Sequence, residues 1–375
     1  MSPEGTNRGD CKKMSEKRVL LLSEAFGAGH TMAAEAIKEG AKLLKPDWEF
    51  RVIELGPNLS PHLSQWIMRC YLKTLRYSPK LWGAVYRKGK HQPLRPAHEF
   101  LLHRLLYNQV KQILRAYEPD FIVCTHPFPS AVISRLKRAG LTTPLYTVVT
   151  DFGTHGAWIS SGVDQYFVPS LQMREQMIEL GVPADKIQVS GIPTHPKFWV
   201  KKEKRAARAQ LGLAELPTLL CMGGGMGLGL SEALLNTLAL FQKRLQILFV
   251  AGKNKELYQM LQEREEFAHP NFHLYAFVDF IDELMDAADL LITKPGGVTC
   301  SEAIAKGIPM ILLEPIPGQE EDNLQYLLEQ QFGVAATPSL LKRLASEPLS
   351  NSLPSIPAPP VGGKQLIEQL IHHVG

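Results

Sequence analysis

The segment RVLLLSEAFGAGHTMAAEAIKEGAKLLKPDWEFRVIEL, residues 18–55, joins an apolar run, a glycine-rich turn, a helical pattern and a second apolar run. Apolar runs separated by helices of about 10 to 15 residues are typical of a parallel sheet covered on both faces. The alternation continues in PDFIVCTHP (119–127), TPLYTVVTDF (143–152) and VDQYFVPS (163–170). This part of the chain is therefore predicted to form an open α/β domain.

The pattern starts again after a basic, helical stretch at 189–213. Five further apolar runs follow: PTLLCMGGG (217–225), LQILFVAG (245–252), NFHLYAFV (271–278), ADLLITKPGG (288–297) and IPMILLEP (308–315). With 375 residues, the chain is also long enough for two domains. We predict two doubly wound, Rossmann-like domains that face each other across a central cleft, where open α/β sheets bind their ligands.

The composition sets the domain boundaries and the broad class. We expect a flexible N-terminus at 1–16, a first domain at 17–197, a second at 198–350, and a Pro- and Ser-rich connection to a terminal helix at 351–375. The five scattered cysteines contain no CxxC pair, which argues against a zinc site and a disulfide framework and favours a reducing cytoplasm. No run of about 18 apolar residues occurs, so we expect a soluble protein or one that lies on a membrane.

Charge is distributed unevenly although the net charge is only +4. Residues 55–98 contain no Asp or Glu, but they contain eight Lys or Arg residues and five Trp or Tyr residues. Basic and interfacial aromatic side chains together favour a surface for anionic lipid headgroups. A nucleic-acid surface and an ordinary helical core are the alternatives. The membrane interpretation selects Trp66, Arg69, Lys73 and Trp82.

The glycine-rich turn at 23–40 is a poor dinucleotide site. Gly27 and Gly29 are followed by Met32 where the fingerprint needs a third glycine. What remains is a tight turn with His30 near the start of the helix, exposed at the carboxyl end of the first strand. His30 is either a helix cap or a functional base, and its position after a strand favours the base.

The second domain carries two stronger glycine loops. Residues 223–227 leave space for a ligand against the backbone, and Gly296, Gly297 and Thr299 stand where the next helix begins. Amides at that helix start are suited to a diphosphate, and Glu302 to ribose hydroxyls. Gln319 and Glu320, in PIPGQEEDN, are suited to a polyhydroxylated ligand, or else form a solvated acidic loop. No strict D-x-D is present, so we expect neither a metal nor another cofactor.

Five motifs, spread over nearly the whole chain, carry a family resemblance: SEAFGAGHTMAAEAI, TVVTDFGTHGAW, GGGMG, TKPGGVTCSEA and PIPGQEEDN. They resemble the diacylglycerol glycosyltransferases, which comprise bacterial processive diacylglycerol glucosyltransferases and plant monogalactosyldiacylglycerol synthases. More distantly, the chain is similar to the N-acetylglucosaminyltransferase that forms lipid II. This chain has FGAGH where the bacterial enzymes tend to have Asn.

The resemblance implies a GT-B fold, a UDP-sugar held by the C-terminal domain, a lipid acceptor bound by the N-terminal domain, and inversion at the sugar carbon. It puts His30 on the acceptor side, beside Gly29. It implies donor contacts at Gly224, Gly225, Phe277, Val278, Thr299, Glu302, Gln319 and Glu320.

The chemistry fits this assignment, because an acceptor hydroxyl needs a base and histidine titrates near neutrality. We prefer His30, with Asp151 either orienting it or acting as the base itself. His155 and Trp158 either line the acceptor or sugar pocket or form a helix start with an anchoring aromatic ring.

The sequence thus predicts an inverting transferase that moves a hexose, most simply glucose, from UDP to diacylglycerol or a glycosyl-diacylglycerol. We expect it at the inner face of the cell membrane, bound to an anionic surface and not to nucleic acid. A galactose or N-acetylglucosamine donor, a UDP-sugar epimerase and a non-catalytic UDP-sugar sensor are the alternatives.

Overall fold

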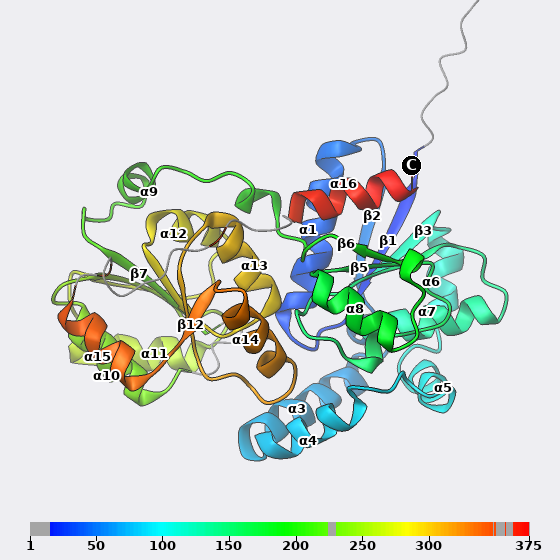
Figure 1. Cartoon of the computed structure of the whole chain (residues 1–375), viewed down its shortest axis with the longest axis horizontal. Coiled ribbons are helices and arrows are strands. Elements are labelled where there is room, and N and C mark those ends of the chain that lie inside the picture. The colour runs from blue at the N-terminus through cyan, green and yellow to red at the C-terminus, as the bar shows by residue number, and fades with distance from the viewer. Residues whose placement is uncertain (1–15, 224–229, 348, 350–356, 358–362, 375) are drawn as a thin grey trace, which may run out of the picture.

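The computed structural model describes residues 16–223, 230–347, 349, 357 and 363–374. Two six-stranded sheets, with helices on both faces of each, lie side by side (Figure 1). Every strand pair in both sheets is parallel. The predicted class, two doubly wound α/β domains, is therefore confirmed. The N-terminal expectation for 1–16 falls almost wholly outside the described residues.

The first sheet has the strand order β2-β1-β3-β4-β5-β6. Its central strands are buried on both faces, which is why their sequences are apolar throughout. The strands are β1 (Arg18–Ser23), β2 (Glu49–Glu54), β3 (Phe121–Cys124), β4 (Leu145–Val148), β5 (Gln165–Val168) and β6 (Ile187–Val189).

Helices and short 3-10 turns connect these strands. The connection from β2 to β3 is by far the longest and contains five helices, including the acid-free stretch. The elements are α1 (Ala28–Leu44), α2 (Leu55–Leu59), α3 (Pro61–Tyr77), α4 (Pro79–Gly89), α5 (Pro96–Leu105), α6 (Val110–Tyr117), α7 (Pro127–Arg138), η1 (Gly156–Trp158), α8 (Leu171–Glu179), η2 (Ala184–Lys186) and η3 (Pro196–Phe198).

The second sheet has the order β12-β11-β10-β7-β8-β9. Its strands are β7 (Thr218–Met222), β8 (Gln246–Val250), β9 (Phe272–Tyr275), β10 (Leu290–Thr293), β11 (Met310–Leu312) and β12 (Gly333–Ala335). Its helices are α9 (Lys204–Gln210), α10 (Glu232–Phe241), α11 (Lys255–Glu263), η4 (Glu265–Phe267), α12 (Ile281–Ala287), α13 (Gly297–Lys306), α14 (Gln319–Glu329) and α15 (Pro338–Ser346).

The last helix, α16 (Gly363–Val374), returns to the first domain (Figure 1). Its apolar side, with Leu366, Ile367 and Leu370 fully buried, packs in the core formed by β1, β3 and α1. The chain therefore crosses between the domains twice, once before α9 and once before α16.

Each sheet has a point where the direction of winding reverses. In the first sheet this point lies between β1 and β3, and in the second between β7 and β10. Loops at the carboxyl ends of such strands leave a crevice that binds ligands in open α/β sheets. In this chain these loops are the turn before His30 and the loops that follow Met222 and Thr293.

Candidate active site

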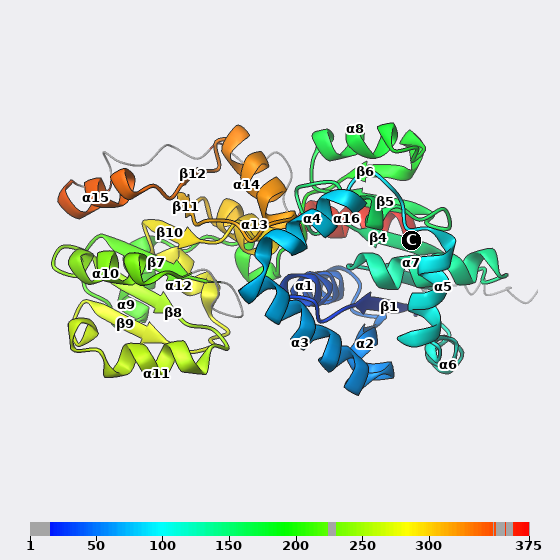
Figure 2. The ribbon, with the colours of Figure 1, turned by 90° about the horizontal axis from the view of Figure 1, so that it is seen from below.

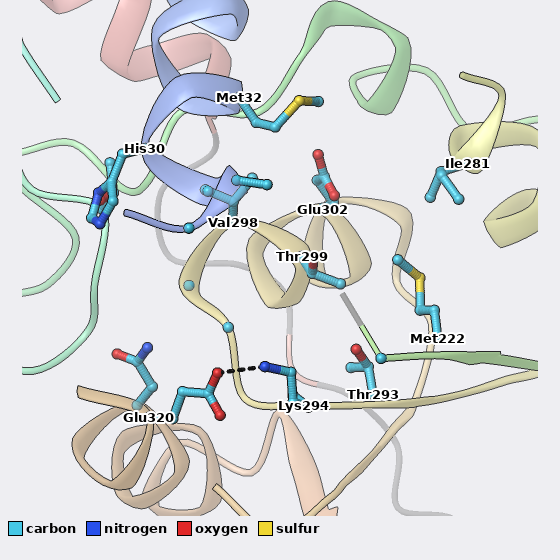
Figure 3. Close-up of a pocket in the computed structure, with 18 of the residues that line it drawn as sticks. His30, Met32, Met222, Ile281, Thr293, Lys294, Val298, Thr299, Glu302 and Glu320 are labelled. Atoms are coloured by element: carbon cyan, nitrogen blue, oxygen red, sulfur yellow. Dashed lines mark hydrogen bonds and ion pairs between the residues drawn. The ribbon is translucent and has the colours of Figure 1, made fainter. Parts of the chain in front are cut away.

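A cavity of about 420 Å³ lies between the domains and is lined by the loops of both switch points. Figure 3 shows the start of α1 on one side of it and α13 with the neighbouring loops on the other. Eleven of the predicted site residues line it: Gly29, His30, Asp151, Phe277, Val278, Gly296, Gly297, Thr299, Glu302, Gln319 and Glu320. Gly224 and Gly225 lie outside the described residues, but Met222 and Gly223 just before them reach the cavity.

His30 is held by the loops that follow β3 and β4. Its Nδ1 lies 3.0 Å from the carbonyl oxygen of Thr125 and 2.7 Å from Oγ1 of Thr150. Because a carbonyl oxygen can only accept, Nδ1 carries the proton in its hydrogen bond to Thr125. The lone pair of the neutral ring is therefore on Nε2, the nitrogen that can take up a proton.

The charge state of His30 follows from burial. Burial lowers its pKa below 6.5, and the nearby Asp151 carboxylate and the Thr125 carbonyl oppose this shift without cancelling it. Burial raises the pKa of Asp151, while the charge of His30 and a hydrogen bond from Asn323 oppose the rise. At neutral pH the imidazole ring of His30 is therefore neutral, and the negative charge of Asp151 favours its protonated form.

The start of α13 is the side of the cavity most suited to an anion. Its N-cap is Gly296, which has no side chain to cap the first turn, and residues 296–299 line the cavity. Amides at such a helix start, together with the macrodipole, favour negative charge. Gly297 is required there, because a Cβ at this position would lie 2.1 Å from the carbonyl oxygen of Thr150 in the other domain.

Glu302 lies one turn further along α13 and also lines the cavity (Figure 3). Burial, with a smaller contribution from Asp282, raises its pKa to about 8. A buried carboxyl group with so high a pKa is typical of a binding site in which a ligand supplies the missing donors.

Lys294 is a cavity residue that the sequence reasoning did not select. Its Nζ forms a 2.8 Å ion pair with Oε1 of Glu320, and both side chains are largely buried (Figure 3). The other oxygen of Glu320 accepts a hydrogen bond from the Ile316 amide. The cavity therefore contains the Lys294–Glu320 ion pair beside the start of α13. The signal was available, because Lys294 directly precedes the Pro-Gly-Gly turn.

Asn323 was also missed, and for it no local signal exists. Its Oδ1 accepts a 2.7 Å hydrogen bond from the Phe152 amide, and its Nδ2 donates to Oδ1 of Asp151 at 3.3 Å. This residue of α14 therefore ties the second domain to the loop that carries Asp151.

His155 and Trp158 lie outside the described lining of the cavity. His155 caps η1 by accepting a hydrogen bond from the Ala157 amide through Nδ1. Trp158 is buried in the core, with its ring centroid 6.1 Å from that of His30. These positions match the alternative of a helix start with an anchoring aromatic ring.

The predicted membrane residues occupy two different environments. Trp66, Arg69 and Lys73 lie on one exposed stripe of α3, and Trp66 is 62% exposed. Trp82 is half-buried on α4 and packs edge to face on Tyr71, with centroids 4.9 Å apart. Trp82 faces inward because α4 turns a second face toward the other domain.

Comparison with known proteins identifies the class. The monogalactosyldiacylglycerol (MGDG) synthase model matches residues 30–194, and the glycosyltransferase family 28 C-terminal domain matches residues 218–342. Among solved structures, MurG of Acinetobacter baumannii superposes with a TM-score of 0.53 at 15% identity over 88% of this chain and 89% of that one. Anabaena HepE in complex with UDP-glucose gives 0.55 at 15% identity over 96% and 99%. The protein is a glycosyltransferase with the GT-B fold.

Sequence relatives identify the family. A processive diacylglycerol β-glucosyltransferase of Bacillus mycoides is 31% identical over 82% of this chain and 79% of the relative. The chloroplastic monogalactosyldiacylglycerol synthase of Spinacia oleracea is 33% identical over 85% of this chain and 63% of its own length. The chain belongs to the diacylglycerol glycosyltransferase family, as its motifs predicted.

Proposed function

We propose that this protein transfers a hexose, most simply glucose, from a UDP-sugar to diacylglycerol or a glycosyl-diacylglycerol, with inversion at the sugar carbon. The observation that carries the proposal is the cavity of about 420 Å³ between the domains, which is lined by the loops of both switch points. The first domain contributes His30, which is buried and neutral. The second domain contributes the start of α13, Lys294, and Glu302, whose carboxyl group has no hydrogen-bonding partner among the described residues. Relatives named for transfer to diacylglycerol support the lipid acceptor.

The proposed reaction is one displacement. The acceptor oxygen forms a bond to the anomeric carbon from the face opposite the diphosphate, and the bond from that carbon to UDP breaks. His30 Nε2 takes the acceptor proton, and Asp151 stabilises the resulting charge. The α13 amides and Lys294 stabilise the leaving diphosphate, and Glu302 accepts hydrogen bonds from the ribose hydroxyls. The proposed contacts to the leaving diphosphate thus come from the chain's own amides and from Lys294, and we propose no metal or other cofactor.

We also propose that the protein binds the anionic inner face of the cell membrane through α3, α4 and α5, which lie along the same edge in Figure 1. Exposed apolar and aromatic residues alternate there with the cations Arg69 and Lys73; they are Trp66, Tyr77, Leu81, Val85, Phe100, Leu101 and Leu105. Such a mixture suits lipid headgroups better than nucleic acid, which we do not propose as a partner. In the described parts of the chain, no helix combines the length and apolar character needed to cross a bilayer.

The test is an incubation of purified protein with diacylglycerol vesicles and UDP-glucose, UDP-galactose or UDP-N-acetylglucosamine in turn. We expect UDP release and a glycolipid with one of these donors, glucose first. Sugar isomerisation without acceptor would instead indicate an epimerase. UDP binding with no turnover on any donor would indicate a sensor, and either result would refute the proposal.

A further inference from the structure

Helix α4 of the first domain has two faces with different neighbours. Leu81 and Val85 are exposed on one face, whereas Trp82, Tyr86 and Lys90 lie at the spacing of another face about a third of a turn away. Figure 2 shows α4 at the boundary between the two sheets, close to α14 of the second domain. The inward face is therefore a contact between domains.

The main contact joins Lys90 to Asp322. Lys90 Nζ donates to Asp322 Oδ1 at 2.6 Å, and the two side chains are 31% and 17% exposed. The Tyr86 hydroxyl lies 3.5 Å from the other oxygen of Asp322. A neighbouring pair, Arg87 with Glu321, is longer at 3.5 Å and more exposed. The partly buried Lys90–Asp322 pair is thus the stronger of the two links.

Two hydrogen bonds hold the end of α4 against the loop that follows β4 in the same domain. His155 donates from Nε2 to the Tyr86 carbonyl oxygen at 3.0 Å, since its Nδ1 is occupied as an acceptor. The Gly156 amide donates to the Lys90 carbonyl oxygen at 2.8 Å. Lys90 therefore projects from a point fixed on the loop that begins at Asp151.

Asp322 lies in the first turn of α14, close in sequence to the residues that line the proposed donor site. Gln319 and Glu320 line the cavity, whereas Asp322 packs against Gly153, where a Cβ would lie 2.2 Å from the Asp322 Cβ. Contacts that hold Asp322 therefore help to set the positions of Gln319 and Glu320 and, through the ion pair of Glu320, the position of Lys294, the proposed diphosphate contact.

We propose that Lys90 is a positioning residue for the donor site: by pairing with Asp322, it holds α14 so that Gln319 and Glu320 meet the donor. The inference rests on the proposed donor site. Lys90 lies outside the cavity lining among the described residues, so its loss acts through α14. The effect therefore falls on donor affinity and on KM for the donor, and much less on kcat.

The experiment measures UDP binding by calorimetry and donor kinetics for Lys90→Ala, Asp322→Asn and the double variant. We expect UDP to bind roughly fivefold more weakly in each single variant. The double variant should be about as weak as the singles, because all three lose the same contact. Lys90→Arg should restore binding, and Lys88→Ala, which removes the same charge from the same helix, should bind UDP as the wild type does.

Asp322→Asn separates positioning from long-range electrostatics. Removing a negative charge near an anionic ligand strengthens binding through space, whereas loss of the contact weakens it. The proposal would be overturned if Asp322→Asn bound UDP as tightly as the wild type or more tightly, or if Lys90→Ala kept wild-type UDP affinity. It would also be overturned if the losses of UDP affinity in the two single variants added up in the double variant. If Lys90→Ala has a lower melting temperature than the wild type, Lys90→Gln is measured in its place. A wild-type protein that does not bind UDP would refute the donor site itself, a result distinct from unchanged variants.

Discussion

Glu302 gives the donor site a pH dependence that can be measured without any acceptor. Burial raises its pKa from 4.5 to about 8, so at neutral pH the carboxyl group is mostly protonated in the free protein. Two ribose hydroxyls that donate to Glu302 favour its carboxylate form. The bound state therefore holds fewer protons than the free state, and raising the pH favours UDP binding.

The magnitude follows from the free-protein pKa. With a pKa of about 8, the ionised fraction of Glu302 is about one tenth at about pH 7 and about three quarters at about pH 8.5. UDP affinity should therefore rise about eightfold between these pH values, which is about 1.3 kcal/mol. At about pH 7, binding should release close to one proton.

The assay is calorimetric titration with UDP at both pH values, in two buffers of different ionisation enthalpy. Glu302→Gln cannot ionise, so it should lose the pH dependence and the proton release. Glu256→Gln, which changes an exposed carboxyl group on α11, should retain both. Equal wild-type affinity at the two pH values, or an unchanged slope in Glu302→Gln, would refute this reasoning.

Three further outcomes are expected. Lys306 forms a 2.7 Å ion pair with Asp286, and neither side chain is more than 1% exposed. Lys306→Met leaves the Asp286 carboxylate buried without this partner, so the free energy of unfolding in denaturant should fall by about 3–5 kcal/mol. A loss below about 1 kcal/mol would contradict this. Gly297→Ala should lower kcat/KM about tenfold or more, because a Cβ there would lie 2.1 Å from the Thr150 carbonyl oxygen and push the domains apart; a loss below about twofold would argue against the contact. Arg69→Gln and Lys73→Gln should each weaken sedimentation with anionic vesicles about fivefold, because a cation near the bilayer contributes about 1 kcal/mol; unchanged binding would exclude α3 from the membrane surface.

The sequence was most informative where the relevant residues are close along the chain. The buried strands of both sheets are apolar runs, so burial alone marks them. Gly296, Gly297 and Glu302 belong to one strand end and one helix, and their spacing was enough to predict a shared site. The same holds for Gln319 and Glu320.

Contacts between distant segments could not be predicted in this way. The partners of His30 are 95 and 120 residues away, and their side-chain geometry depends on how three strand ends meet. Asn323 and Lys90 act across the domain boundary, which no local pattern encodes. The acid-free stretch was predicted to form a membrane surface that includes both Trp66 and Trp82, but it folds into separate helices, so Trp66 faces outward and Trp82 inward.

The most direct test of the central claim is the His30→Ala variant, assayed for glycolipid formation on diacylglycerol vesicles and for UDP affinity in the same preparation. Loss of the base should reduce turnover by about a hundredfold or more, since general base catalysis contributes about 10²–10⁴. UDP affinity should stay within about twofold, because the donor contacts belong to the other domain. Turnover near that of the wild type in His30→Ala would contradict the account.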